Sequence, residues 1–496
     1  MMNSIVEENR ISFKELEQKI FAYVCELGRE ITRIMLESYD RELAEGRDKK
    51  AYRGKGSRRT TIKTVYGEVE YRRRVYQTKT ENGQIAHVFL LDQAMRMDKI
   101  GLISTNLAEK IALTVTESPY RTTADIISQT CGQSISAQGV WNMMQRLGER
   151  IDEEEMHAVK QMEAEQTEGT RPLPVLFEEM DGVWLSMQDE HHKKMKKQEM
   201  KVFTMYEGWD AEKEKEGRST LVGKTMLAGM EESRTFHEKR EACIRRKYDA
   251  DEIGQRILNG DGGGSWIREP YDPDAIFQLD RYHICQEVLR KIKDRKAQQD
   301  IRTLLEEEKI GEMLEYIRIY ADSVESSEDG EKRGKKAKEL LKYLEKNKEG
   351  LLPYDRRGVR IPEPLEGILY KHMGVQENQN CTVITMRMKH RRMRWSVSGA
   401  NNLAKALYRR ENKELTDTIE RYTDGLVFTM QMRQVIETLS AARAPKRDGK
   451  GNKYAERISC HMPLLDAMQT VLSGIFLLPV ATQSHQIKIS MNRTQI

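Results

Sequence analysis

Apolar residues near the N-terminus recur at helical spacing. The series advances in steps of three and four residues: Phe13, Leu16, Ile20, Val24, Leu27, Ile31 and Ile34. Ser12 and Glu15 stand at its start in a capping-box pattern, which marks the beginning of a helix. Together they predict one long amphipathic helix over residues 11–45. Its length exceeds that of an ordinary globular helix and indicates a surface for self-association within residues 1–48.

Residues 60–77 change to alternation, with β-branched and aromatic residues on both sides of Gly67. Alternation around a glycine predicts a β-hairpin. Successive strand residues point to opposite faces, so Arg72 and Arg74 share one face and Arg73 lies on the other. At least one arginine-bearing face of the hairpin is therefore exposed.

Residues 121–147 follow a helix-turn-helix pattern. A turn at 131–132 separates a short helix from a second helix that begins at Ser136. The side chains expected on the inner side of the second helix are Val140, Trp141 and Met144. The second helix of such a unit typically enters the major groove of DNA, although many helical pairs share the pattern without binding DNA. The acidic stretch 151–172 then predicts a helix and a linker.

From residue 173 short apolar runs alternate with charged loops. Strand-like runs occupy 173–187, 201–208, 219–230, 256–267 and 275–284, with a helical stretch near 233–247. This order predicts a sheet of mixed direction with helices packed against it. Residues 284–350 are charged and almost purely helical, and the helical pattern returns from about 400 to 440.

The composition limits the class of protein but indicates no particular binding partner. The chain has 496 residues, a length that suggests about three domains. Charged residues make up 33% and the mean hydropathy is −0.72, so this is a polar chain. The 83 Lys and Arg nearly balance the 79 Asp and Glu, and the formal charge of +4 favours no particular partner. The six cysteines form no CxxC pair, so neither a zinc ribbon nor a disulfide framework is supported.

Targeting and membrane signals are missing from the pattern. No apolar run reaches the roughly 18 residues that a membrane span needs, and the opening MMNSIVEENR has no apolar signal core. We therefore expect a cytoplasmic protein with no membrane partner.

The distribution of charge is more informative than its total. Residues 49–79 hold eleven Lys and Arg against two acids, and a second basic run has no acid from 385 to 394. A third basic cluster lies at 443–453. Any one cluster has a plain explanation as a solvated surface, but three clusters with Tyr and Trp nearby favour contact with a phosphate backbone.

Three aspartates stand at the ends of apolar strand-like runs: Asp181, Asp261 and Asp280. Asp261 also opens the glycine-rich turn DGGGS, which allows a ligand to approach the backbone closely. Mg²⁺ prefers hard oxygen ligands, so carboxylates that converge at one sheet edge are candidate metal ligands. Each aspartate taken alone is equally typical of a turn or a helix cap. Glu178 and Glu179 precede Asp181 on the same strand, with Glu179 on its face, and burial or a salt bridge is expected for both.

Several segments together resemble a known family. DGVWLSMQ, NGDGGGSWI, QLDRYH and GVQENQNCTVITMRMKHRRMRWSVSGANNLAKAL, with RRTTIKTVYGEVEYRRRVY in the hairpin, are similar to the ISLre-type insertion-sequence transposases of bacteria. That group was long catalogued as an uncharacterised protein family and is related to the Mutator-like transposases. The resemblance covers most of the chain and implies a DDE transposase.

The resemblance also implies residue roles. Asp181 would be the first aspartate of the triad, Asp261 the second and Glu377 the closing glutamate, with Glu363 or Glu366 as alternatives in another register. The 80 and 116 residues between successive acids suit an inserted helical domain before the last one. Asp280 and His283 match an Asp-x-x-His signature and would position the scissile DNA.

The implied fold class is α+β, with an RNase H-like mixed-sheet catalytic domain that carries a helical insertion and follows an α-helical and β-hairpin DNA-binding domain. The expected divisions are a long helix at 1–48, a DNA-binding region at 49–150, a first catalytic part at 173–283, a helical insertion at 284–355, a second catalytic part at 356–440 and a C-terminal region at 441–496.

The expected activity is Mg²⁺-dependent (or Mn²⁺-dependent) cleavage and transfer of DNA strands, with two ions held by the triad. Double-stranded DNA and a second copy of the chain are the expected partners. The residues expected to position DNA beside the triad are Asp280, His283, Arg387, Lys389, Arg391, Arg392 and Arg394. The residues expected to bind the DNA ends are Arg58, Arg59, Lys63, Arg72, Arg73, Arg74, Ser136, Gln138 and Asn142. The alternatives are an inactive transposase-derived DNA-binding protein and an RNase H-like nuclease.

Overall fold

The computed structural model describes residues 12–80, 82–95, 102–262, 265–267, 270–325 and 331–423. All of them belong to one compact unit, Met1–Met430, and the second unit, Gln431–Ile496, lies outside the described residues. The basic cluster at 443–453 and the C-terminal region at 441–496 therefore stay predictions.

A long helix and a hairpin form the N-terminal part. Helix α2 spans Phe13–Gly46, and Ser12 and Glu15 form the capping box that the sequence predicts. The first sheet has the order β1-β2-β3, with β1 at Arg53–Thr64, β2 at Gly67–Lys79 and β3 at Ile85–Val88. The predicted hairpin is confirmed, and Gly67 has the positive φ of 119° that its place beside the turn requires.

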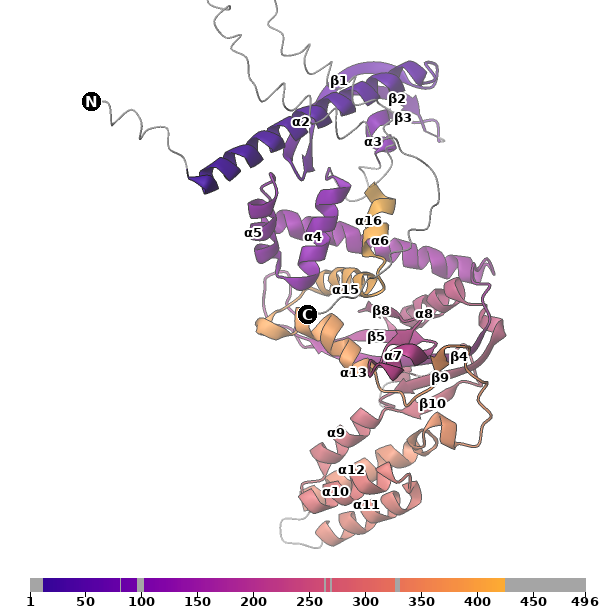
Figure 1. Ribbon diagram of the computed structural model, residues 1–496. Coiled ribbons are helices and arrows are strands. Elements are labelled where there is room, and N and C mark those ends of the chain that lie inside the picture. Colours follow the sequence, from indigo (N-terminus) through magenta and orange to yellow (C-terminus); the bar gives the residue numbers. More distant parts are fainter. Residues whose placement is uncertain are drawn as a thin grey trace, which may run out of the picture. The chain divides into compact units, whose positions relative to one another are not determined.

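Helix α2 lies along β2 and protects its open edge (Figure 1). Where β2 has no partner strand on that side, the Arg72 amide donates to Glu37 at 3.0 Å and the Arg74 amide donates to Asp40 at 3.1 Å. Carboxylates on α2 thus satisfy backbone donors that an exposed edge strand would offer to another chain. The start of α2 exposes Phe13, whose self-association role stays a prediction.

The predicted helical pair is confirmed, with two differences. The helices of this region are α3 at Leu90–Ala94, α4 at Thr105–Glu117, α5 at Tyr120–Thr130 and α6 at Ala137–Glu163. Ser136 caps α6 by accepting a hydrogen bond from the Gly139 amide at 3.0 Å. The expected separate helix after residue 150 is instead the continuation of α6. Trp141, expected inside, is 36% exposed, because α6 buries Val140 and Met144 on its other side.

The centre of the fold is a five-stranded sheet of order β10-β9-β4-β5-β8. Its strands are β4 at Leu173–Leu185, β5 at Gln198–Tyr206, β8 at Thr225–Gly229, β9 at Ile253–Gly260 and β10 at Ile276–Leu279. β5 pairs antiparallel with β4 and with β8, whereas β9 runs parallel to β4 and to β10. The predicted mixed sheet is confirmed, and the chain is an α+β protein. Between the last two strands the chain forms a short 3₁₀ turn at Ser265–Ile267.

Both faces of the central strand are buried, which explains its nearly continuous apolar sequence. Leu176 and Met180 belong to the main core, to which helices α6, α8 (Ser233–Lys247) and α15 (Val397–Glu411) contribute. Phe177 faces the other way, where its ring stacks on Tyr206 at 5.4 Å between centroids. The face that carries the odd-numbered residues also carries Glu179 and Asp181.

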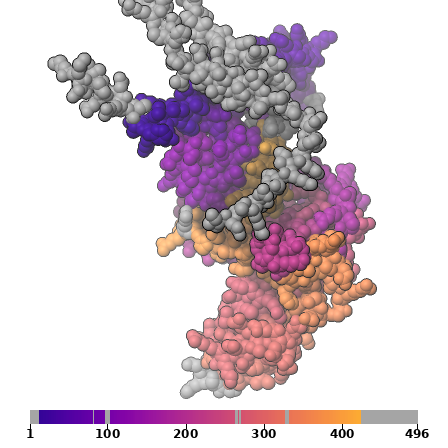
Figure 2. All heavy atoms as spheres, in the orientation of Figure 1, coloured from indigo at the N-terminus to yellow at the C-terminus, as the bar shows by residue number. Residues whose placement is uncertain are grey.

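Two smaller units complete this part. A small sheet has the order β11-β6-β7, with β6 at Gly208–Asp210, α7 at Ala211–Lys215, β7 at Leu221–Val222 and β11 at Ile368–Leu369. Four helices form the insertion: α9 at Arg281–Lys291, α10 at Arg295–Glu306, α11 at Ile310–Glu325 and α12 at Glu331–Lys346. They share a core of their own, and their spheres gather into one group in Figure 2.

The chain then closes over the sheet. One helical segment runs through α13 at Gln376–Gln379, a π-helical stretch at Asn380–Thr385 and α14 at Met386–Met388, and α16 at Leu415–Thr423 follows α15. Short 3₁₀ turns also occur at Ala250–Glu252, Lys348–Leu351, Tyr354–Arg356 and His390–Arg392. No helix in the described part of the chain is long and apolar enough to cross a membrane.

Candidate active site

The strand register brings three aspartates to one level of the sheet. Met180 of β4 pairs with Gly260 of β9, and Gly260 pairs with Leu279 of β10. The next residue on each of these parallel chains is Asp181, Asp261 or Asp280. Asp181 differs from the expectation in one respect, because β4 does not end there but continues to Leu185 through its pairing with β5.

Asp181 is the most constrained of the three. Its side chain is 12% exposed, and the Asn380 amide donates to its Oδ2 at 2.6 Å. Burial, and to a smaller extent the negative charges of Asp261 and Glu377, raise the pKa of Asp181 to about 6. His283 opposes this with a positive charge, its Nε2 lying 3.6 Å from Oδ1 of Asp181. The site thus holds more negative charge than its own cations neutralise.

Asp280 and His283 form a pair at the start of α9. Asp280 caps the helix through the Tyr282 amide at 3.1 Å, and its Oδ2 lies 2.9 Å from Nδ1 of His283. Burial would lower the pKa of His283, but the bond to Asp280 and the charge of Asp181 outweigh it and raise that pKa to about 9. His283 is therefore protonated near neutral pH and bridges Asp280 and Asp181.

Asp261 lies in the turn that follows β9, and the helical insertion contacts that turn. Tyr343 of α12 donates its hydroxyl to the Asp261 backbone oxygen at 2.5 Å. Gly262 has a φ of +64°, and a Cβ there would lie 2.7 Å from the side chain of Asn347. The insertion therefore holds the backbone of the second aspartate in place.

Glu377 is exposed, and Glu179 of the central strand β4 holds the start of the helix that carries it. The carboxylate of Glu179 accepts hydrogen bonds from the amides of Gly374 at 3.0 Å and of Val375 and Gln376, both at 3.2 Å. These amides belong to the first turn and its lead-in, where helix donors lack partners inside the helix. Burial raises the pKa of Glu179, and these hydrogen bonds oppose the rise. Glu179 thus anchors the closing helix one residue before Glu377.

The orientation of Glu377 follows from Asn380. Residues three apart share one face of a helix, and Asn380 contacts Asp181, so Glu377 lies on the side that faces β4. Its charge is the largest cause of the raised pKa of Tyr282 at the start of α9. Of the alternatives, Glu363 acts instead on Tyr370, whose pKa is raised first by burial and then by the charge of Glu363.

Glu179 and Asn380 are the residues that inspection of the sequence misses as parts of this site. Glu179 is predicted to be buried, as it is, but its partners lie almost two hundred positions away. The available signals were its shared face with Asp181 and, for Asn380, its place one turn after the proposed glutamate. Glu178, on the opposite face, forms the predicted salt bridge, with Arg256 at 2.7 Å.

The basic run after the closing helix divides into two groups. Arg387 is 6% exposed, donates to the Val115 backbone oxygen at 2.6 Å and lies over the rings of Tyr120 and Trp395. It therefore holds α4 and α5 against the closing helix. The residues of the run that are exposed are Lys389, Arg392 and Arg394, and the side chain of Arg391 lies outside the described part.

The hairpin arginines also divide by face. Arg58 and Arg72 are exposed, and Arg59 pairs at the surface with Glu70 at 3.1 Å. Arg73 is held by Asp92 at 3.0 Å and lies 4.0 Å from the ring centroid of Phe89. Arg74 pairs with Asp40 at 2.6 Å. The separation of Arg73 from its neighbours matches the predicted alternation.

The hairpin and helix α6 together line a cavity of about 450 Å³. Lys63 lines it from β1, and Asn142 lines it from α6. Gln138, exposed on the same helix, donates to Asn142 at 2.9 Å. Ser136 is committed to capping α6 but is also exposed. The structure thus brings Lys63 and Asn142 together at the first turns of α6.

A tighter carboxylate group lies elsewhere. Within the described residues, the ligand atoms of Asp152, Glu155 and Glu231 form the one group of three or more that all lie within 4.8 Å of one another. Lys239 and Lys405 already neutralise most of its charge, with each ammonium within 3.0 Å of all three carboxylates. Two buried ammonium groups repel a cation, so this group holds the fold together.

Comparison with known proteins gives a family. The model of an uncharacterised protein family, UPF0236, matches residues 6–421. The chain belongs to this family. A UPF0236 protein of Caldanaerobacter subterraneus subsp. tengcongensis is 26% identical over 414 residues, covering 82% of this chain and 79% of its own length.

A second UPF0236 protein is described as lying in the vanSb 3′ region of Streptococcus gallolyticus. It is 22% identical over 396 residues, covering 78% of this chain and 81% of its own length. The name of the Caldanaerobacter relative joins eleven designations with one prefix, and another relative from that organism, 25% identical over 402 residues, joins four. The family is thus bacterial and rich in paralogues.

Proposed function

We propose that this chain is a DDE-type transposase of a bacterial insertion sequence, which cuts and joins DNA strands with a divalent cation. The observation that carries the proposal is the convergence of Asp181, Asp261 and Glu377 from three distant segments. Their charges are coupled, and the charged groups around them leave a negative excess.

The sheet supports an RNase H-like catalytic fold. Such a sheet has three antiparallel strands continued by two strands parallel to the first, and β8, β5, β4, β9 and β10 follow that order and direction. The first aspartate lies on the central strand and the second follows its parallel neighbour. A helical insertion separates them from the glutamate, as the resemblance implies.

The donor set suits Mg²⁺ or Mn²⁺. Asp181, Asp261 and Glu377 offer hard oxygen ligands, and two divalent ions would favour the ionised form of Asp181, whose pKa is raised mainly by burial. When bound, such ions activate an attacking oxygen and stabilise a leaving oxygen. Asn380 fixes one oxygen of Asp181, and Glu179 holds the helix of Glu377.

The reaction has two balanced steps. Water attacks a phosphodiester at the element's end, the bond from phosphorus to the 3′ oxygen breaks, and a 3′ hydroxyl and a 5′ phosphate result. That hydroxyl then attacks a target phosphodiester and releases a new 3′ hydroxyl. The protonated His283, held by Asp280, would donate to the phosphate that lies beside Asp181.

The relatives support a mobile element. One name that joins eleven designations in one organism is what repeated insertion of one sequence would produce. Recognition of the element's ends by the hairpin and α6 is supported by the cavity that Lys63 and Asn142 line and by the exposed Gln138 beside it.

The test is strand cleavage and joining on a duplex that carries the DNA flanking the gene, with Mg²⁺ or with EDTA. Asp261→Asn should lower product formation by about a thousandfold or more, because bound metal supplies several kcal/mol of transition-state stabilisation. Asp251→Asn, at a residue whose side chain is 84% exposed just before β9, is the matched control and should leave the rate unchanged. Equal product from wild type and Asp261→Asn would contradict the proposal, and cutting without any joining would favour the nuclease.

A further inference from the structure

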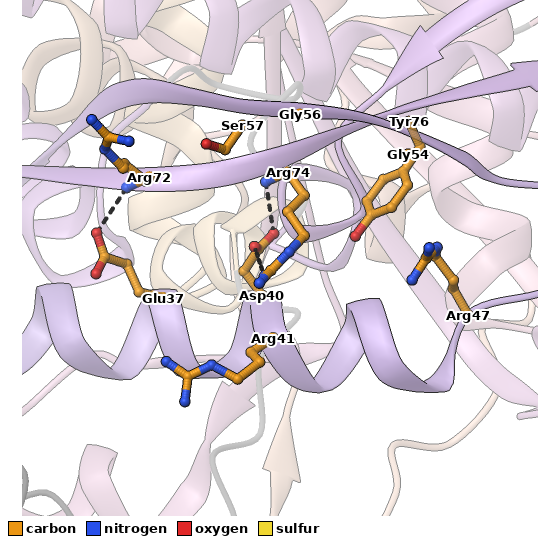
Figure 3. Close-up of a pocket in the computed structure, with 10 residues that line it drawn as sticks. All are labelled: Glu37, Asp40, Arg41, Arg47, Gly54, Gly56, Ser57, Arg72, Arg74 and Tyr76. Atoms are coloured by element: carbon orange, nitrogen blue, oxygen red, sulfur yellow. Dashed lines mark hydrogen bonds and ion pairs between the residues drawn. The ribbon is translucent and has the colours of Figure 1, made fainter. Parts of the chain in front are cut away.

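A groove of about 550 Å³ lies between α2 and the β1–β2 hairpin (Figure 3). Four arginines line it against two acids: Arg41 and Arg47 from the helix side, Arg72 and Arg74 from β2, and Glu37 and Asp40. The residues that line this groove lie between positions 37 and 76, far along the chain from the carboxylates of the candidate active site. The sequence pattern does not predict a groove there. The excess of arginine over acid indicates an anionic ligand.

The two acids of the groove are already satisfied. Glu37 pairs with Arg33 at 2.9 Å and accepts the Arg72 amide at 3.0 Å. Asp40 pairs with Arg74 at 2.6 Å and accepts its amide at 3.1 Å. Neither carboxylate therefore has a full charge left to offset the remaining arginines.

Two guanidinium groups are left without a partner of their own. Arg41 and Arg72 are exposed, and neither forms an ion pair within the described part of the chain. Figure 3 shows them extending from the helix and from the strand, both away from the pair formed by Asp40 and Arg74. The two guanidinium groups lie on opposite sides of the groove, so an extended polyanion would contact one on each side.

Glycines form the remaining wall. β1 has a register shift between Gly54 and Ser57, and Gly56 has a φ of +96°, a conformation that favours glycine. A Cβ at Gly54 or at Gly56 would meet nothing within 4 Å, so the space in front of this backbone is open. Gly54 has no positive φ that would demand glycine, and the open space there suits close approach of a ligand.

We propose that this groove holds the phosphate backbone of duplex DNA. The positive surface continues along β1 through the exposed Arg53, Lys55 and Arg58, which suits a polyanion better than a single phosphate. Tyr76 is the one aromatic residue of the lining, and it is 1% exposed and covered by Arg47 at 5.1 Å. Bases therefore find no stacking platform of the kind that single-strand binders use.

The groove would position the protein on DNA and leave the choice of sequence to other contacts. The inference rests on the proposed function only in taking DNA as the ligand. It adds Arg41 and the glycine wall to the contact surface and leaves Arg73, on the other face, out of it.

The test is binding of a labelled duplex, with the element's end or with a random sequence, across a range of salt. Each phosphate contact contributes about 0.9 to the slope of log affinity against log salt. Removing two contacts in the Arg41→Gln, Arg72→Gln double variant should lower that slope by about 1.8. The affinity lost between 50 and 200 mM salt should then be roughly tenfold smaller, and equally so for both duplexes.

Two further variants isolate the groove. Arg302→Gln, at an exposed residue of α10, removes one charge elsewhere and should leave the slope unchanged. Gly54→Leu alters no charge, and its Cβ would meet no atom within 4 Å, yet it should weaken binding by filling the open space. An unchanged slope in the double variant, or full binding by Gly54→Leu, would overturn the proposal. So would a polyglutamate peptide that binds the groove more tightly than the duplex does.

The outcomes separate this inference from the proposed function. Normal binding by the groove variants, with cleavage still lost in Asp261→Asn, overturns the groove alone. A lowered salt slope in a protein that never cuts DNA supports the groove and contradicts the transposase.

Discussion

Two groups of carboxylates lie in the described part of this chain, and they differ in their counter-charges. Asp152, Glu155 and Glu231 are packed within 4.8 Å of one another, and two buried lysines neutralise most of their charge. Asp181, Asp261, Asp280 and Glu377 are set more loosely around a single histidine. The first group joins α6 and α15 to α8, and the second joins the strand ends to the closing helix.

One carboxylate from each group, Glu231 and Asp181, shows how the two surroundings act on a pKa in opposite directions. Burial alone would raise the pKa of Glu231, but the charges of Lys405 and Lys239 outweigh it and lower that pKa to about 2. Burial and like charges raise the pKa of Asp181 to about 6. The comparison teaches that unmatched negative charge, rather than the closeness of carboxylates, marks the candidate metal site.

The largest expected effect comes from removing a lysine from the neutralised group, by which we mean Asp152, Glu155 and Glu231 with Lys239 and Lys405. Lys405→Met leaves Glu155 and Glu231 short of a buried partner, and such a loss costs about 3–5 kcal/mol of unfolding free energy. Urea unfolding followed by tryptophan fluorescence measures it. Lys342→Met, at an exposed residue of α12, is the control and should stay within about 0.5 kcal/mol of wild type. A variant at Lys405 as stable as this control would show that the lysine is dispensable.

The next effect is the acid dependence of the same group. Because the folded-state pKa of Glu231 lies below its ordinary value of 4.5, its stabilisation is present above that pH and is lost as the pH falls toward 2. Wild type should lose on the order of 2–3 kcal/mol more than Glu231→Gln between pH 5 and pH 2.5. Parallel stability curves for the two proteins would contradict the ion-pair account.

A smaller effect is expected at the anchor of the closing helix. Glu179→Gln removes a charge that three backbone amides contact, so the helix of Glu377 should lose its fixed position. We expect Mn²⁺ affinity and DNA cleavage to fall about 10–100-fold, as for other residues that orient metal ligands. Glu179→Asp, which keeps the charge, should recover part of both. Loss of stability with unchanged Mn²⁺ affinity would reduce Glu179 to a structural residue.

The smallest effect has the opposite sign. Asp181→Asn removes a charge whose burial is unfavourable, so in EDTA at pH 8 the variant should be about 1–3 kcal/mol more stable than wild type. Since the folded state holds the Asp181 proton more tightly than the unfolded chain, wild-type stability should fall as the pH rises from 4 to 6. The two proteins should therefore be equally stable near pH 4. If the substitution instead lowers the stability at pH 8, the charge of Asp181 is stabilised by its surroundings, as that of Glu231 is, and the prediction is wrong.

Features set by neighbouring residues were predictable from the sequence. The capping box at Ser12, the turn at Gly67 and the cap at Ser136 depend on positions three or fewer residues apart. The convergence of Asp181, Asp261 and Asp280 was also predictable, because parallel strands bring their carboxyl ends to one edge.

Features set by distant packing were not predictable. Trp141 is exposed because α6 turns its opposite side to the core, and Arg387 is buried because Val115 offers it a carbonyl oxygen. The partners of Glu179 and Asn380 lie almost two hundred residues away along the chain. The sequence indicates the faces on which Glu179 and Asn380 lie, but not the distant residues that they contact.

Titration of Mn²⁺ into the protein, followed by electron paramagnetic resonance, tests the central claim most directly. Wild type should bind two ions, Asp261→Asn should lose at least most of that binding, and Glu231→Gln should bind as wild type does. Retained binding in Asp261→Asn together with loss in Glu231→Gln would move the metal site to the neutralised group and contradict the account.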